Sequence, residues 1–179
     1  SVGNVVALRP GAEDREPLVL SAHLDTVFPA GTDVTVHADG DLFRAPGVSD
    51  DGRGLAALVT VARALSQADI TTQTPILFAA TVGEEGSGDL RGVRHLFESG
   101  GVAADAAGFI SLDGAGMKYV VTRALGARRF QVVLSGQGGH SWINYGAPNP
   151  IHALGRAIGA LASWPPPTDP ALSLTVARW

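Results

Sequence analysis

Apolar and polar positions follow two patterns along the first two-thirds of the chain. Apolar runs typical of buried strands occur at residues 18–22, 75–82 and 107–112. Between these runs, apolar residues recur at helical spacing, which predicts a helix over about residues 52–68 and a second through residues 90–97. Alternation of strands and helices predicts an α/β domain with a mostly parallel central sheet flanked by helices.

Two further features complete this first region. A strand-like run at residues 4–8 opens the chain. Residues 35–37 and 42–44 flank a turn that contains Gly40, a pattern typical of a β-hairpin.

The pattern changes after about Thr122. A strand is predicted over residues 128–135, a helix over 150–164 and a strand over 172–178, which together resemble a β-α-β piece of a second small domain. We therefore divide the chain into residues 1–122 and 123–179. The chain does not begin with Met and both its ends lie on strand-like runs, so we expect it to be cut at both ends.

Composition narrows the class of protein. Hydrophobic residues make up 45% of the 179 residues and charged residues 17%, enough for a buried core. The net charge is -4, Lys118 is the only lysine and there is no Lys/Arg run, which argues against nucleic-acid binding and against an anionic membrane surface. No apolar stretch approaches the roughly 20 residues that span a bilayer. The absence of cysteine excludes disulfides and thiolate chemistry and fits a reducing compartment, so we expect a cytoplasmic protein.

Acidic and imidazole side chains gather where the predicted strands end. They are His23 and Asp25 after the first buried run, Asp50 and Asp51 before the first helix, Glu84 and Glu85 after the second run, and Asp113 after the third. In open α/β sheets ligands bind beyond the carboxyl ends of the strands, so these groups can converge. Like charges in a partly buried cleft repel unless a cation neutralises them.

A divalent metal, or two, would supply that cation. Mixed imidazole and carboxylate ligands suit zinc, and also cobalt or manganese. His23 and Asp25 face the same side of an extended strand, so Asp25 can accept a hydrogen bond from a metal-binding His23. One of Glu84 and Glu85 can bind metal while the other takes a proton from water. The alternative is that each acid is a solvated loop residue or a helix cap.

The motifs at residues 21–27, 47–54 and 81–86 resemble those of the M20 metallopeptidase family, and residues 138–142 with 148–154 look like the start of its lid domain. The resemblance implies a zinc-peptidase-like catalytic domain over residues 1–122 and part of an α+β ferredoxin-like lid over 123–179, both incomplete.

The resemblance also implies roles for single residues. His23 and Asp113 would bind one metal ion, Glu85 the other, and Asp50 would bridge the two. The peptide bond that follows Asp50 is often cis in that family. Asp25 would orient His23.

Two catalytic roles follow from the same resemblance. Glu84 would be the general base, taking a proton from the bridging water and passing it to the leaving nitrogen. His140 would stabilise the oxyanion in the partner subunit of a dimer that forms through the lid. The family's last metal-binding histidine follows the lid and is not in this sequence. We therefore expect this piece to bind the second metal weakly and to be poorly active.

The function implied is hydrolysis of short peptides by a water that two divalent metals, zinc first, activate. A deacylase or amidohydrolase of N-acyl amino acids stays open, as does a truncated fragment that only binds metal or a partner. Serine-hydrolase chemistry is disfavoured because no Gly-x-Ser-x-Gly motif is present.

Several polar residues are given structural roles. We assign His37 to the hairpin, and His95 and His152 to helices. Asn144 and Asn149 flank the lid motif and either touch substrate or have surface or capping roles.

Overall fold

The computed structural model describes residues 3–98, 100–114, 116–169 and 171–177. The chain divides into two compact units, residues 1–120 and residues 121–179, and each is described by itself. We refer to them as unit 1 and unit 2.

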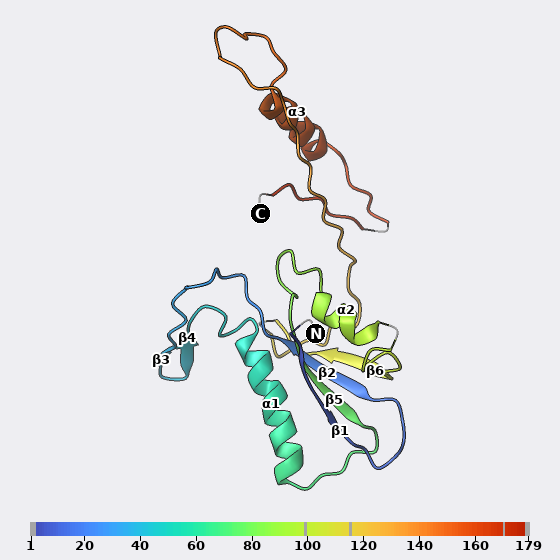
Figure 1. The fold of residues 1–179 in the computed structure, drawn as a ribbon. Coiled ribbons are helices and arrows are strands. Elements are labelled where there is room, and N and C mark those ends of the chain that lie inside the picture. Colours follow the sequence, from blue (N-terminus) through green and yellow to red (C-terminus); the bar gives the residue numbers. More distant parts are fainter. Residues whose placement is uncertain (1–2, 99, 115, 170, 178–179) are drawn as a thin grey trace. The chain divides into compact units, whose positions relative to one another are not determined.

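Unit 1 is built on a four-stranded sheet (Figure 1). Its strands are β1 (Val5–Arg9), β2 (Leu18–His23), β5 (Ile76–Thr81) and β6 (Gly108–Ser111), in the order β1-β5-β2-β6. β2 runs parallel to both of its neighbours, whereas β1 is an antiparallel edge strand paired with β5. This confirms the predicted α/β fold with a mostly parallel sheet.

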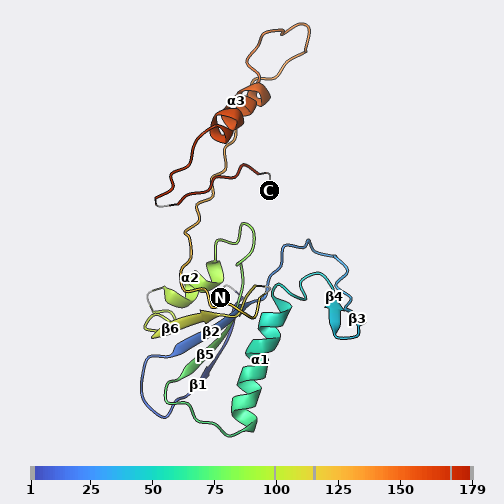
Figure 2. The same ribbon diagram turned by 180° about the vertical axis from the view of Figure 1, so that it is seen from behind.

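Helices cover the two faces of the sheet at β2 and β5, which explains the apolar runs that make up most of these two strands. The edge strands β1 and β6 are mostly exposed. Val19, Leu77 and Ala79 point to one face and pack with Leu96 of α2 (Arg91–Phe97). Leu20, Ala22 and Phe78 point to the other face, where they pack with Leu58 and its neighbours on α1 (Gly52–Gln67). The two views of the ribbon show α1 and α2 on opposite sides of the sheet (Figures 1 and 2).

The order of the strands places a topological switch at β2. The chain passes from β2 through α1 to β5 on one side, and from β5 through α2 to β6 on the other side of β2. In open α/β sheets such a point forms a ligand-binding crevice outside the carboxyl ends of the strands. The carboxyl end of β2 is His23.

The predicted hairpin is present as β3 (His37–Asp39) and β4 (Leu42–Arg44), an antiparallel pair in which His37 opposes Arg44. Its first strand starts two residues later than the pattern predicted. Gly40 has a positive φ of 58° in the turn, a backbone conformation that glycine adopts without strain.

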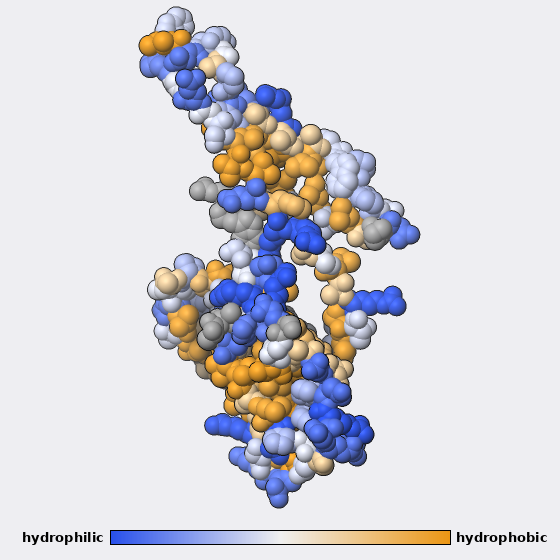
Figure 3. Space-filling model, turned by 45° about the vertical axis from the view of Figure 1, so that its right-hand side comes forward, coloured by the Kyte–Doolittle hydropathy of each residue, from blue (hydrophilic) through white to orange (hydrophobic). Residues whose placement is uncertain are grey.

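Unit 2 contains one helix, α3 (Pro150–Ala162), among its described residues. Asn149 caps this helix, because its side-chain oxygen accepts hydrogen bonds from the backbone N–H groups of Ile151 and His152. None of the helix residues is buried. Figure 3 shows apolar residues at the surface of the molecule.

The two strands predicted for unit 2 are not formed over its described residues. Residues 128–135 and 172–177 pair with no neighbouring strand, and Thr168 and Ala171 form an isolated bridge. Residue 178 lies outside the described residues. Strand patterning specifies a face to bury but does not supply the partner whose hydrogen bonds make a ladder. Throughout the described residues no helix is long and apolar enough to cross a membrane.

Candidate metal centre

His23 lies at the end of β2 with only 3% of its side chain exposed, and both of its ring nitrogens face oxygen atoms. Nδ1 lies 2.8 Å from the backbone carbonyl oxygen of Asp25, and Nε2 lies 2.8 Å from Oδ1 of Asp50. A carbonyl oxygen has no proton to give, so Nδ1 must donate. Nε2 then faces a carboxylate, and these two acceptors can share the contact only with a proton or a metal cation between them.

The acidic groups around His23 favour its protonated, positively charged ring. Burial by itself lowers the pKa of His23, but the hydrogen bonds to Asp25 and Asp50 and the charges of Asp51 and Asp113 outweigh it, so the pKa is raised. The site therefore attracts positive charge at the ring.

Two groups of side chains around His23 have the spacing of metal ligands. Asp50 and Asp113 form one group with His23, and Glu84 and Glu85 form the other. Within each group the ligand atoms lie within 4.8 Å of one another. One imidazole nitrogen with several carboxylate oxygens is a donor set that suits zinc, so the residues fit such an ion. The strand ends converge as the sequence predicts.

Asp51 has a different place from its neighbour Asp50. Only 2% of it is exposed, and its carboxylate accepts hydrogen bonds from the backbone N–H groups of His23 at 2.9 Å and Gly54 at 3.0 Å. It therefore caps α1 and ties that helix to the end of β2. For this acid the helix-cap alternative holds. The Asp50–Asp51 peptide bond is cis, as the family resemblance implied.

Asp25 meets His23 through its backbone rather than through its carboxylate. The carboxylate oxygen Oδ1 is 3.9 Å from Nδ1, outside hydrogen-bond distance. The carboxylate instead accepts hydrogen bonds from the backbone N–H groups of Gly83, Glu84 and Glu85. Burial raises the pKa of Asp25, but these donors outweigh burial, so the pKa is lowered.

Glu84 has a raised pKa, in contrast to Asp25. Burial is the largest cause, and the negative charges of Asp113, Glu85 and Asp25 add to it against the opposing charge of His23. A carboxylate with a raised pKa accepts a proton more readily, which suits a general base.

Two residues without a predicted role support the site. Arg53 of α1 donates a hydrogen bond to the carbonyl oxygen of Gly114, next to Asp113. Asn4 accepts from the N–H of Val82 and donates to the carbonyl oxygen of Gly92, and so joins the end of β5 to α2. The Asn4 partners are 78 and 88 residues away in the chain, and no local pattern indicates such pairs.

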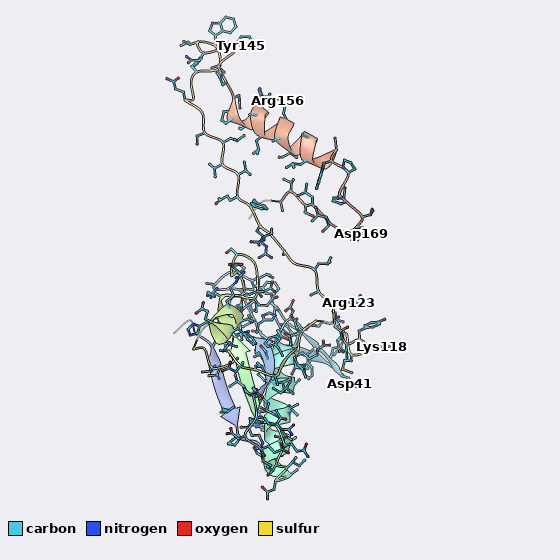
Figure 4. The ribbon with its side chains drawn as sticks, turned by 90° about the vertical axis from the view of Figure 1, so that its right-hand side faces the viewer. Asp41, Lys118, Arg123, Tyr145, Arg156 and Asp169 are labelled. Carbon is cyan, nitrogen blue, oxygen red and sulfur yellow. The ribbon has the colours of Figure 1, made fainter. Side chains whose placement is uncertain are left out.

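His140 belongs to unit 2. Its Nδ1 accepts hydrogen bonds from the backbone N–H groups of Trp142 at 3.2 Å and Ile143 at 3.4 Å. An accepting Nδ1 means that Nε2 carries the proton of the neutral ring and is a donor. Asn144 holds the same loop, because its side-chain oxygen accepts from the backbone N–H of His140. Tyr145 follows at the exposed end of this loop (Figure 4).

The remaining histidines lie where the sequence predicts. His37 lies in β3, His95 in α2 and His152 in α3. None of them is in either group of candidate metal ligands among the described residues. Asn149 has the capping role that was one of its two predicted alternatives.

The family model described as peptidase family M28 matches residues 4–141, a span that includes every candidate site residue from His23 to His140. No curated protein matches the chain. The family is one of zinc-dependent metallopeptidases, so the metal-dependent hydrolase predicted from the motifs is confirmed at that level. The match does not show membership of the M20 family, whose motifs the sequence resembles. Because the matched residues cover well over half of the 179, the chain belongs to peptidase family M28.

Proposed function

We propose that this protein hydrolyses peptide bonds of short peptides at a centre of two divalent metal ions held around His23. The observation that carries the proposal is the ring of carboxylates around this buried histidine, both of whose nitrogens face oxygen atoms. In this proposal His23, Asp50 and Asp113 would hold one ion, and Glu85 would hold the other together with Asp50. The order of the motifs, which resembles that of the M20 family, supports giving Asp50 a share in both ions. When bound, the ions supply Lewis acidity and lower the pKa of water towards about 7.

Glu84 moves the protons in this reaction. Its carboxylate takes a proton from the attacking water and delivers it to the leaving nitrogen, so that an amine departs as the peptide bond breaks. The raised pKa of Glu84 supports the role, because a stronger base transfers protons more effectively near neutral pH. Glu85 is the next residue along the chain, and its carboxylate is left to bind metal.

His140 acts as a hydrogen-bond donor in the same proposal. The two backbone N–H groups on Nδ1 leave Nε2–H available to an oxyanion.

Replacing Glu84 and Glu85 one at a time tests the assignment. We expect Glu84→Gln to lower kcat by about 10²–10⁴-fold with metal content nearly unchanged, because only the base is lost. We expect Glu85→Gln to lower metal content as well, because a ligand is lost. Glu98→Gln, at an exposed glutamate, is the control and keeps both.

Turnover near normal in Glu84→Gln would show that this residue is not the base. A panel of dipeptides, tripeptides and N-acyl amino acids then tests the substrate class. Preference for N-acyl amino acids would replace the peptidase by a deacylase.

A further inference from the structure

Three successive backbone N–H groups in the loop after β5 converge on one carboxylate. Gly83 and Glu84 donate to Oδ1 of Asp25 at 2.8 and 3.2 Å, and Glu85 donates to Oδ2 at 3.0 Å. Consecutive N–H groups turned to one side form a concave anion site, here filled by a side chain of the protein itself. The two glutamates of the candidate centre therefore lie on a loop that is folded around Asp25.

The loop is closely packed as well as hydrogen-bonded. Gly83 has a positive φ of 73°, and a Cβ on Gly88 would lie 2.5 Å from the Cα of Gly83. Gly88 also donates a backbone hydrogen bond to the carbonyl oxygen of Glu85 at 2.9 Å. A loop this tight has little room to adjust, so the position of the Asp25 carboxylate sets where the main chain of residues 83–85 runs.

The carboxylate of Asp25 makes no direct hydrogen bond to His23. Nδ1 of His23 lies 2.8 Å from the backbone carbonyl oxygen of Asp25 and 3.9 Å from Oδ1 of the Asp25 carboxylate. A side-chain substitution leaves that carbonyl oxygen in place, which means that the two contacts of this residue can be separated by experiment.

We propose that Asp25 is a positioning residue whose carboxylate aims Glu84 and Glu85 by holding the main chain of residues 83–85. The consequence for catalysis rests on the proposed function, in which those glutamates are the base and a metal ligand. The structural part of the proposal stands independently, because it concerns amide groups that can be observed in the metal-free protein.

The test compares Asp25→Asn with the unmodified full chain. Asn has one acceptor oxygen in place of two, so it cannot accept hydrogen bonds from all three N–H groups at both positions of the carboxylate. Its NH2 group would face a backbone N–H group from which it cannot accept. We expect hydrogen exchange at the amides of residues 83–85 to become about ten-fold faster or more in the metal-free protein. The ¹⁵N shifts of the His23 ring should stay unchanged, with Nδ1 still protonated.

Asp25→Glu keeps both oxygens on a longer side chain, and it covers the case in which Asp25→Asn does not fold. We expect exchange at the same amides to be intermediate between the unmodified chain and Asp25→Asn. Glu16→Gln, at an exposed acid of unit 1, is the matched control and changes neither measurement.

Two results would overturn the proposal. One is an altered His23 ring spectrum with unchanged protection at residues 83–85, which would mean that Asp25 acts through the histidine. The other is no change in either measurement. Neither result depends on turnover. Failure of the proposed function would appear differently, as fast exchange at these amides in Asp25→Asn together with normal activity in Glu84→Gln.

Discussion

The two units of this chain differ in how they use apolar residues. In unit 1 the central strands β2 and β5 are covered on both faces, and Val19, Ala79 and Leu96 are 1% exposed or less. In unit 2 the helix α3 has no buried residue, and Leu161 on it is 44% exposed. Both regions carry helical patterns of similar quality in the sequence. The difference shows that a pattern specifies which face to bury, while burial itself requires partners.

The two units also differ in their content of acidic residues. Sixteen of the 17 acidic residues lie in residues 1–120, and residues 121–179 hold five arginines and only Asp169 as an acid. Figure 4 labels Asp169 and Arg156, two of these charged residues of unit 2. Carboxylate chemistry, and with it the candidate metal centre, therefore belongs to unit 1.

The largest expected effect comes from matched leucines in the two units. We expect Leu96→Ala in α2 to lower the free energy of unfolding of unit 1 by about 2–5 kcal/mol, because it leaves a cavity between helix and sheet. Leu161→Ala in α3 should cost less than about 1 kcal/mol, since that side chain is already part-exposed and alanine favours helix. Urea unfolding followed by far-UV circular dichroism and by amide exchange in each unit measures both.

Tryptophan fluorescence separates the units in the same experiment. All three tryptophans lie in residues 121–179, so their signal reports on unit 2. Equal losses for the two leucine variants would contradict the difference in burial between the units.

Helix caps give the second comparison. Asp51→Ala removes the cap of α1 and also leaves the buried N–H of His23 without its acceptor, so we expect a loss of about 3 kcal/mol in unit 1. Asn149→Ala removes only the cap of the exposed helix α3, and we expect about 1 kcal/mol or less. Amide exchange within α1 and α3 measures each effect locally.

Asp51→Asn refines that measurement, because it keeps one acceptor oxygen and the size of the side chain. It should cost less than Asp51→Ala. A loss no larger than that of Asn149→Ala would mean that the buried bridge from β2 to α1 contributes little beyond an ordinary cap.

Much of unit 1 could be predicted from the sequence because its signals are local. Continuous apolar runs predicted β2, β5 and β6, and helical spacing predicted α1 and α2, each within two residues of its observed ends. The convergence of His23, Asp50 and Asp113 followed from the rule that parallel strands end at one edge of the sheet. The catalytic roles of these residues remain predictions.

The parts that could not be predicted depend on contacts between distant residues. The spacing of His23 and Asp25 indicated a bond between the two side chains, whereas the carboxylate of Asp25 binds N–H groups 58 to 60 residues further along. Asn4 bridges segments that no local pattern relates to it. In unit 2 the strand patterns were present, but without neighbouring strands among the described residues they formed no ladder.

Zinc binding gives the third and smallest expected effect. It should stabilise unit 1, which holds the candidate ligands, and not unit 2. A ligand that binds only the folded state stabilises it by about 2.7 kcal/mol when its free concentration is 100 times its Kd. We expect zinc to slow amide exchange by the corresponding factor, about 100-fold, in the sheet and α1 of unit 1, and to leave α3 unchanged. His23→Gln should remove most of the protection, because His23 belongs to both candidate groups and would hold one of the two proposed ions. His37→Gln, at the exposed histidine of the hairpin, is the control and should keep it. Equal protection of both units, or protection that survives in full in His23→Gln, would mean that zinc binds elsewhere, with His140 and His152 of unit 2 as the next residues to replace.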